Sequence, residues 1–475
     1  MKYILFLFLV FVLASSCRKD VEFTNSPVSL TFSTDTINFD TIFSLKDSGK
    51  IGLPKSITLR LIVTNPNESA IKTSIQMEGN QNGLFKLNAD GISGNGNLQK
   101  IENIEILGKD SIYIFVQTYI NPLNFTPSDE FAVVDSILFT TNGNRQKVVT
   151  VSYPQDANYF QSETLKGNEI WTIEKPFVIY DDILVDKGAT LTINPGVKIY
   201  SHNNSTIYVA GTIKILGTID NPVVLQGDRL DDDYKEVSNQ WNGIHILSTS
   251  VNNVISCAII KNGFIGIRVD SLSMNLNPKL ELSQTIIQDM GAVGLLSYSA
   301  HVKATNNLIS NCGQYCFLGD LGGKYEFTFN TFAATGGTQA RKNATFTITN
   351  TPFRDANNNI TVFPLSYTLI NNIIWGSNDD EINFVRDEQG ITNTAIVKNN
   401  NIKSELFRDE LLANSANINS NQITLDPSFV DANKKNYKIK GGSVCSGQGN
   451  KSTGISFDIT NKFRSNPSIG AYEPD

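Results

Sequence analysis

The sequence is poor in the residue types that usually assemble metal centres. Its 475 residues include only 3 histidines and 5 cysteines, and no two cysteines form a CxxC pair. Zinc sites are built from clustered cysteine and histidine ligands, so a zinc protein is not expected. The four cysteines after residue 17 are too few for a disulfide framework in so long a chain. Cys312 and Cys316 could pair across one turn, or could both stay as free thiols in a core.

Charge is also scarce. Charged residues make up 18% of the chain, and the formal net charge is -7. A nucleic-acid partner requires a basic stripe that neutralises phosphates, and the sequence has none. The composition likewise gives no support for binding an acidic polysaccharide through a broad cationic surface.

Segments with the 3.6-residue apolar periodicity of helices are hard to find. The chain instead has 34 glycines, many asparagines and threonines, and 40% hydrophobic residues. Glycine and asparagine favour turns, whereas threonine, valine and isoleucine favour strands. An all-β protein with many turns is therefore expected.

The N-terminus has the pattern of an export signal. A basic start is followed by an apolar run over residues 3–14, which is too short to span a bilayer. The run ends in Leu13-Ala14-Ser15-Ser16-Cys17, which resembles a bacterial lipoprotein signal. This resemblance implies a signal peptide over residues 1–16, a lipid on Cys17 and a tether over residues 17–26. An ordinary secretory cleavage, with Cys17 incidental, is the alternative.

The same resemblance carries an expectation about location. No later segment of the sequence is long and apolar enough to form a transmembrane helix, so acyl chains on Cys17 would be the anchor. The chain is then expected to be an outer-membrane lipoprotein that could be exposed on the cell surface.

Residues 27–159 are predicted to form a first domain. Apolar and polar residues alternate from Val28 to Phe32 and from Ile57 to Val63, with the period of half-buried strands. Asn142-Gly143 is a typical hairpin turn. About seven short strands separated by turns indicate a β-sandwich. Two stretches resemble immunoglobulin-like modules of bacterial surface proteins, which implies a spacer or docking role: 58–65 and 108–114.

A short apolar phrase recurs in the second part of the chain. The last apolar residues of its copies lie 27, 22, 23, 42 and 28 residues apart, and they are Ile260, Ile287, Ile309, Phe332, Ile374 and Ile402. A period near 22 that stretches only at polar inserts is typical of a solenoid. The phrases are short and rich in β-branched residues, so each coil is expected to contribute strands.

Residues 161–475 are therefore predicted to form a parallel β-helix. The segments 188–199 and 209–218 resemble the opening coils of right-handed parallel β-helix proteins of the pectate-lyase-like superfamily. The segments 426–431 and 469–473 resemble the closing part of many secreted members, which implies a C-terminal cap. Asparagines at the coil corners are expected to bond to one another as a ladder: Asn307, Asn330, Asn372 and Asn400.

The first candidate site is the acidic insert that precedes Trp241. Its four carboxylates could hold Ca²⁺ through oxygen ligands, and they are Asp231, Asp232, Asp233 and Glu236. No other cofactor motif is evident. Tyr234 and Trp241 could instead stack against sugar rings. The alternative is a solvated acidic loop, with Trp241 covering the core. Residues 227–231 and 240–244, in and directly after this insert, resemble a group of Bacteroides-type β-helix lipoproteins.

The second candidate is a lyase site. Lys261 and Arg268 fall on one predicted coil beside Asp270, where a basic residue could remove a proton from a sugar; a surface ion pair is the alternative. The lyase and hydrolase signatures known on this scaffold (Asn-Thr-Asp, Gly-His-Gly and Arg-x-Pro-x-x-Arg) do not occur. The three histidines have no partner spacing and are expected at surfaces or corners.

A second insert, residues 339–364, begins like a calcium loop at Asp355, but Ile360 and Ser366 depart from the EF-hand pattern. Any function is expected in this insert or in the insert 228–240. The acidic run 379–381 is expected to be solvated.

The sequence leaves three hypotheses about function. The leading hypothesis is a lipid-anchored β-helix protein that binds a glycan or a partner protein at the cell envelope without catalysis. The competing class is a polysaccharide lyase or glycoside hydrolase, because carbohydrate-active enzymes dominate the family that the sequence resembles. A structural adhesin is a third reading.

Overall fold

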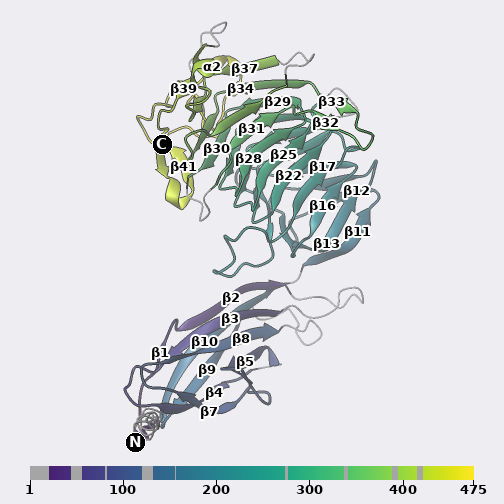
Figure 1. Cartoon of the computed structure of the whole chain (residues 1–475). Coiled ribbons are helices and arrows are strands. Elements are labelled where there is room, and N and C mark those ends of the chain that lie inside the picture. The colour runs from purple at the N-terminus through teal and green to yellow at the C-terminus, as the bar shows by residue number, and fades with distance from the viewer. Residues whose placement is uncertain are drawn as a thin grey trace, which may run out of the picture. The chain divides into compact units, whose positions relative to one another are not determined.

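The structure is a computed structural model of the chain. It describes residues 21–43, 56–80, 83–119, 132–155, 157–272, 277–335, 341–387, 394–413 and 421–474. The predicted signal peptide and Cys17 lie outside these residues. Within them, no helix combines the length and the apolar character needed to cross a membrane. The chain divides into two units, residues 1–156 and 157–475, and each is described by itself (Figure 1).

The first unit consists of two five-stranded sheets (Figure 1). One sheet has the order β1 (Thr31–Phe32), β3 (Ser56–Thr64), β8 (Ser111–Tyr119), β5 (Phe85–Ala89), β6 (Ile92–Ser93). The other has the order β2 (Thr36–Phe43), β10 (Asn144–Gln155), β9 (Val133–Thr141), β4 (Ile71–Met77), β7 (Ile101–Ile106).

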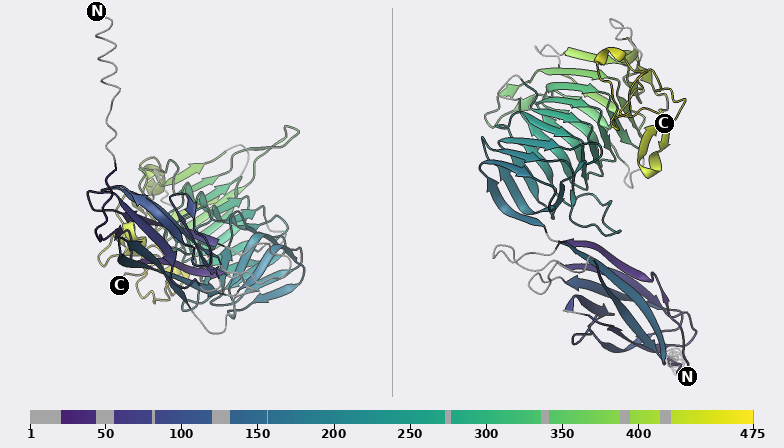
Figure 2. Two further views of the ribbon diagram at one scale, coloured as in Figure 1. Left: turned by 90° about the horizontal axis from the view of Figure 1, so that it is seen from below. Right: turned by 180° about the vertical axis from the view of Figure 1, so that it is seen from behind.

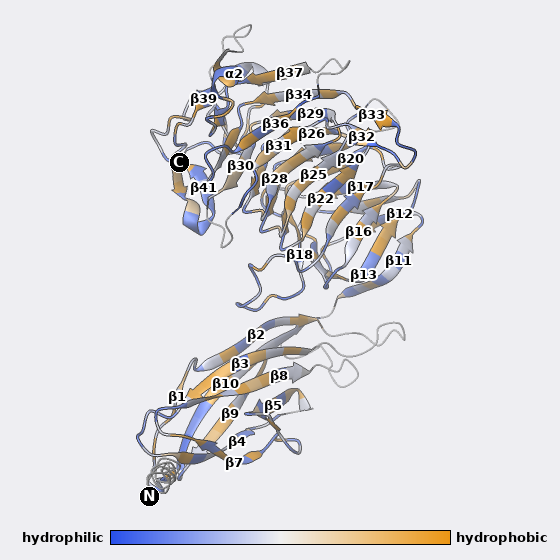
Figure 3. Cartoon of the chain, in the orientation of Figure 1, coloured by the Kyte–Doolittle hydropathy of each residue, from blue (hydrophilic) through white to orange (hydrophobic). Residues whose placement is uncertain are grey.

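Both sheets of the first unit contribute to one hydrophobic cluster, which includes Leu61 of β3 and Ile75 of β4. Alternate residues of β4 are buried, as expected for strands with one face on a core. Asn142 and Gly143 join β9 to β10 with φ angles of 50° and 86°, so the predicted hairpin turn is confirmed. Figure 3 shows the apolar residues along these strands.

The second unit is a stack of coils held together by three ladders of parallel strands, which we call ladders A, B and C (Figures 1 and 2). Each complete coil visits them in that order. Ladder A contains β12 (Asn168–Trp171), β14 (Thr190–Ile193), β17 (Thr212–Leu216), β20 (Asn253–Ser256), β23 (Leu280–Ser283), β26 (His301–Thr305), β29 (Gly323–Thr328), β34 (Leu365–Ile370) and β37 (Thr394–Lys398). The prediction of a parallel β-helix is confirmed.

Ladders B and C share the long strand β13 (Phe177–Val185), against which β11 (Asn158–Leu165) pairs. Ladder B continues with β15 (Lys198–Ser201), β18 (Val223–Gly227), β21 (Ala258–Lys261), β24 (Ile286–Gln288), β27 (Leu308–Ser310), β30 (Thr331–Ala334), β35 (Ile373–Gly376), β38 (Asn401–Ile402) and β39 (Gln422–Ile423). Ladder C continues with β16 (Thr206–Val209), β19 (Gly243–Ile246), β22 (Ile265–Asp270), β25 (Val293–Tyr298), β28 (Tyr315–Asp320), β31 (Phe346–Thr349) and β36 (Ile382–Val385).

The repeated apolar phrase forms the buried side of ladder B. The six marker residues, from Ile260 to Ile402, pair with one another in direct register and are fully buried. The gap of 42 residues between two markers has a structural cause. Strand β31 lies inside the predicted insert 339–364, so this segment comprises two separate corners with a strand of ladder C between them.

The predicted asparagine ladder is present at the corner between ladders A and B. The side-chain amide of Asn307 donates to the side-chain oxygen of Asn330 at 2.9 Å. Asn330 donates in the same way to Asn372, and Asn372 to Asn400, at 3.0 Å each. Asn421 adds one further rung, which the sequence did not reveal. Because these side chains also bond to backbone groups of neighbouring coils, they satisfy polar atoms in a buried corner.

The C-terminal tail packs on the side of the stack. Phe429 of β40 (Phe429–Asp431) and Tyr437 of β41 (Asn436–Ile439) share a hydrophobic cluster with Leu308 and Ile373, which face outward from ladder B. Gly470 has a φ of 98°, and a side chain there would collide with Ile373. The tail therefore covers the outer face of ladder B, whereas the sequence suggested a cap on the last coil. The last coil is followed by a short helix, α2 (Arg408–Ala413).

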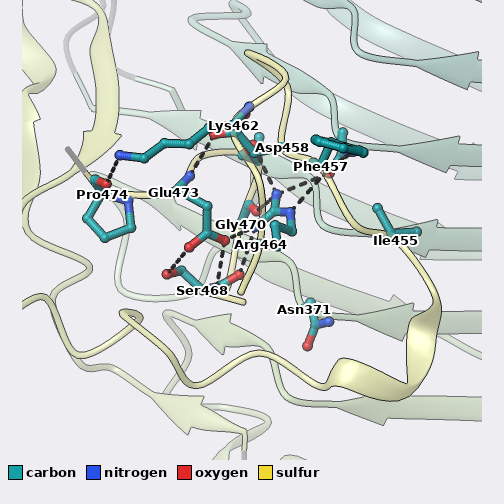
Figure 4. A network of polar contacts seen from close by, with 12 residues as sticks. Asn371, Ile455, Phe457, Asp458, Lys462, Arg464, Ser468, Gly470, Glu473 and Pro474 are labelled. Atoms are coloured by element: carbon teal, nitrogen blue, oxygen red, sulfur yellow. Dashed lines mark hydrogen bonds and ion pairs between the residues drawn. The ribbon is translucent and has the colours of Figure 1, made fainter. Parts of the chain in front are cut away.

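A buried polar network holds the tail together (Figure 4). Arg464 pairs with Glu473, which also accepts hydrogen bonds from the backbone and hydroxyl of Ser468. Asp458 accepts the backbone N–H of Glu473 at 2.9 Å. The guanidinium of Arg464 lies 4.0 Å from the ring centre of Phe329, at a corner of the stack. The tail residues that resemble the family's closing segment thus have a structural role.

Candidate functional site

Two cavities lie along the two edges of ladder C. The first, of about 850 Å³, crosses the corners of successive coils where strands of ladder C begin, and we call it the corner cleft. Its floor contains residues 289–291, 311–313 and 334–335. Its walls contain residues 236–239 of the acidic insert, and Asn433 and Lys435 of the tail.

The second cavity, of about 580 Å³, lies at the corners where strands of ladder C end, and we call it the apolar groove. Its lining residues are Arg268, Asp270, Ser271, Leu272, Tyr298, Ser299, Leu321, Phe353 and Phe363. Phe353 belongs to the small hairpin of β32 (Phe353–Arg354) and β33 (Ile360–Thr361). This hairpin stands beside the coils and carries exposed apolar side chains (Figure 3).

Three charged groups converge in the corner cleft. The ammonium of Lys435 lies 2.9 Å from the Asp289 carboxylate and 3.2 Å from that of Glu236. Burial raises the pKa of Asp289 above its usual value, even though Lys435 opposes this shift. Burial alone would lower the pKa of Lys435, but its hydrogen bonds to Asp289 and Glu236 raise it overall.

A second charged group borders the apolar groove. The carboxylate of Asp270 accepts a hydrogen bond from Nε of Arg268 at 2.9 Å, and its second oxygen lies 2.7 Å from Nε2 of His245. Burial tends to raise the pKa of Asp270, yet the hydrogen bonds from His245 and Arg268 lower it overall. Arg268 also lies 5.0 Å from the ring centre of Tyr298. The result is a carboxylate held ionised next to an aromatic surface.

The corner that carries Asp270 is fixed from inside by Lys279. Its ammonium donates to the backbone oxygens of Ser248 at 2.8 Å and Asp270 at 2.6 Å, and it is fully buried. Burial lowers the pKa of Lys279 to about 8. This lysine therefore positions one wall of the groove.

A smaller cavity of about 230 Å³ lies further along ladder C. It is lined by Tyr315 and Thr347 of the ladder, by Lys342, and by Asp380. Asp380 accepts hydrogen bonds from the hydroxyl of Ser404 and from two backbone N–H groups. On the outer side of ladder C, Leu296 is buried and its register partner Leu318 is half-buried.

The carboxylates of the acidic insert do not converge on one point. Asp231 is buried and takes two hydrogen bonds from Arg229, at 2.7 and 3.2 Å. Asp232 pairs with Lys235, Glu236 pairs with Lys435, and Asp233 is exposed. Among the residues that the structure describes, no group of three or more acidic, histidine or cysteine side chains could hold a metal ion.

The two aromatic residues of the insert behave differently. Trp241 is only 1% exposed, and its indole N–H donates to the backbone oxygen of Lys261 at 2.9 Å. The idea that Trp241 stacks against a sugar is therefore wrong, because its ring fills the core between coils. Tyr234 remains partly exposed, with the guanidinium of Arg229 3.8 Å from its ring centre.

Lys261 and Arg268 do not form one site. Lys261 ends β21 of ladder B, and its electrostatic neighbours are Asp289, Glu236 and Lys435. Burial lowers its pKa, although the two carboxylates oppose this. Arg268 lies on ladder C and bonds to Asp270. The structure divides the predicted lyase pair between the two edges of ladder C.

The pairing of each histidine with a carboxylate was not predicted from the sequence. His202, His245 and His301 each contact a carboxylate one coil further on, at 2.8, 2.7 and 3.2 Å. The partners Asp228, Asp270 and Glu326 follow 26, 25 and 25 residues later. A search for acids one coil period after each histidine would have found all three pairs.

Two further expectations have definite outcomes. Cys312 and Cys316 are buried free thiols, and burial raises the pKa of Cys312. The acidic run 379–381 is not wholly solvated, because Glu381 is fully buried and pairs with Arg341 at 2.6 Å.

Residues 163–262 match a family model described as a pectate-lyase like beta helix domain. No curated protein sequence matches the chain. A family 123 glycoside hydrolase from Clostridium perfringens is similar over 29% of this chain and 30% of its own, with 8% identity and a TM-score of 0.20. The complex structure of XylC with xylose covers 91% of this chain and 87% of its own, with 11% identity and a TM-score of 0.29. Similarities at this level support no inference about function.

Proposed function

We propose that the protein is a lipid-anchored component of the cell envelope whose β-helix binds a glycan along the outer face of ladder C without cleaving it. The observation that carries this proposal is that the corner cleft and the apolar groove border the same ladder. Coil corners recur about every 4.8 Å along the stack, so polar groups of the cleft can meet successive parts of an extended chain. The first unit would be an immunoglobulin-like spacer, and Cys17 would carry the lipid in the outer membrane, where the β-helix could face the cell exterior.

The chemistry of both cavities suits hydroxyl groups. The corner cleft offers carboxylate oxygens from Glu236 and Asp289, an ammonium from Lys435, and amides from Asn239 and Asn433. The apolar groove adds an aromatic surface beside a planar ion pair. Saccharide sites combine such apolar platforms with a few well-placed polar groups.

In the apolar groove, the ionisation of Asp270 favours binding over catalysis. A glycosidase requires a protonated carboxylic acid next to the scissile bond. Asp270 is held ionised by hydrogen bonds from His245 and Arg268, which lower its pKa. A lyase that uses Arg268 as base is disfavoured, because both hydrogen bonds of this guanidinium to Asp270 would have to be broken first.

Glycoside hydrolysis is the second candidate, and one observation favours it. Asp289 is 8% exposed and its pKa is raised, as expected of a general acid. Glu236 lies close enough to share the same ammonium, so the two carboxylates could serve as an acid and a second catalytic group.

A binding and product assay tests the proposal. The purified full chain is tested by affinity electrophoresis against a panel of polysaccharides, and the same mixtures are assayed for new reducing ends and unsaturated products. Binding without products is expected, with weaker binding in Lys435→Met. Lys434→Met is the matched control, because Lys434 is the neighbouring exposed lysine. Products that disappear in Asp289→Asn would establish hydrolysis instead, and a panel without any binding would refute the proposal.

A further inference from the structure

We infer that the glycan is uncharged where it lies on ladder C, and that the apolar groove is a stacking subsite for one neutral sugar ring, between Tyr298 and Phe353. This inference rests on the proposed function and deepens it. It is carried by the charge state of the lining residues and by the geometry of the groove.

Each cationic side chain that lines the two large cavities already pairs with a carboxylate, among the residues that the structure describes. Arg268 is bonded to Asp270, and Lys435 to Asp289 and Glu236. Arg341 is bonded to the fully buried Glu381 through two contacts of 2.6 and 2.7 Å. A uronate or sulfate group would have to displace a carboxylate from its cation, and would leave that carboxylate unpaired in a partly buried place.

The local charge balance also gives no attraction for an anionic ligand. In the corner cleft, Lys435 contacts Asp289 and Glu236, and Lys261 lies within electrostatic reach of the same two carboxylates, so the charges balance. In the apolar groove, Arg268 and Asp270 cancel each other. Lys342, in the smaller cavity further along ladder C, is exposed and has no carboxylate within salt-bridge distance among the described residues. An acidic polysaccharide could therefore find a cation only outside the two large cavities.

The lining of the groove has the chemistry of a sugar-binding site. Tyr298 and Phe353 offer aromatic surfaces, and Phe353 is 43% exposed although it is a large apolar side chain. A pyranose has an apolar face of C–H groups that packs on aromatic rings, and hydroxyl groups around its rim. Asp270 accepts two hydrogen bonds from Arg268 and one from His245, and a carboxylate can accept about four in all. The remaining lone pair can accept a sugar hydroxyl.

The test compares neutral with acidic polysaccharides. The full chain is titrated with a β-glucan, a xylan without uronate and a mannan, and with polygalacturonate and a sulfated galactan, at about 50 and about 300 mM NaCl. A neutral polymer is expected to bind, with less than about a twofold change in affinity between the two salt concentrations. Phe353→Ala is expected to weaken that binding about tenfold.

Phe463→Ala is the matched control, because Phe463 is an aromatic residue of the tail that is 62% exposed and lies outside the groove. Its affinity should equal that of the unchanged chain. Preferred binding of the acidic polymers, lost at high salt or in Lys342→Met, would overturn the inference and leave glycan binding intact. Neutral binding that Phe353→Ala does not alter would overturn the assignment of the groove. If no polymer binds, the proposed function and the inference both fail.

Discussion

The ammonium of Lys435 lies 2.9 Å from the carboxylate of Asp289, although 146 residues separate them in the chain. Lys435 follows a short 3₁₀ turn (Ala432–Lys434) of the tail, whereas Asp289 is at a corner of the stack. The contact joins the tail to the coils and completes one wall of the corner cleft. Loss of either partner would leave the other with an incompletely compensated charge.

Lys435→Met should lower the free energy of unfolding by about 2 kcal/mol, because Asp289 loses its closest cation in a buried position. Urea unfolding followed by circular dichroism measures this change. Lys434→Met should stay within about 0.5 kcal/mol, because its contact with Asp431 is long and exposed. Equal effects of the two substitutions would show that the Lys435 contact adds no stability.

Asp270 and Asp289 should respond to pH in opposite directions. The pKa of Asp270 is below its value of 3.8 in the unfolded chain, so its stabilising contribution is fully present above that pH and is lost as the pH falls further. The pKa of Asp289 is above 3.8, so its contribution is largest at low pH and declines as the pH rises through the folded-state value. Unfolding free energies of Asp270→Asn and Asp289→Asn, measured from pH 3 to 7 and compared with the unchanged chain, test both signs. Parallel curves for the two variants would contradict this assignment.

Asn372→Ala should destabilise the β-helix by about 3 kcal/mol, because several buried polar groups would lose their partners at once. Asn372 accepts from the backbone and the side chain of Asn330 and donates to Asn400 and to the backbone oxygen of Phe327. Asn383→Ala is the control, because Asn383 lies on β36 of ladder C and is only half-buried. Its effect should be within about 0.5 kcal/mol. Similar melting temperatures for the two variants would rule out a stabilising ladder.

Arg464→Met should loosen the tail. The Arg464 side chain is fully buried, pairs with Glu473 and donates to the side-chain oxygen of Asn306 at 3.1 Å. Its removal leaves Glu473 with an uncompensated charge, which costs about 3 kcal/mol or more. Limited proteolysis should then cleave the tail faster than in Lys462→Met, a change at an exposed lysine of the same segment. An unchanged cleavage rate would contradict the role of this network.

Cys17→Ser should release the protein from membranes into the soluble fraction, because the acyl chains on Cys17 are the proposed anchor. Cell fractionation followed by immunoblotting measures the distribution. Cys445→Ser is the control, since Cys445 is a buried thiol of the tail, and it should leave the protein in the membrane fraction. Membrane retention of Cys17→Ser would point to another anchor.

The repeating part of the fold was accessible from the sequence because it obeys a local rule. The apolar markers from Ile260 to Ile402 and the asparagines at the corners before them recur with the coil period, and the structure places both sets in register. The corner cleft was not accessible, because its walls come from segments that the period does not relate. Glu236 and Lys435 are 199 residues apart, and only the packing of the tail on ladder B brings them together.

The positions of single residues were harder to predict. For Trp241, directly after an acidic insert, the sequence left two alternatives, stacking against a sugar or covering the core, and the structure shows that it closes the core where the insert rejoins the coil. Glu381 looked solvated within an acidic run, but Arg341 lies opposite it at the neighbouring coil. In both cases the deciding contact is with another coil and leaves no mark on the adjacent sequence.

The tail that lies along ladder B also makes the number of coils hard to change. Solenoids commonly gain or lose repeats, because each coil contacts only its neighbours. Here the tail bonds to particular corners: Arg464 to Asn306, Ala471 to Thr331, and Asn450 to Asn371. A coil inserted or deleted between Asn306 and Asn371 would shift some of these anchoring points relative to the others. The length of the tail thus fixes the number of coils between its contacts, and duplication of coils in this region should be tolerated only with a matching change in tail length.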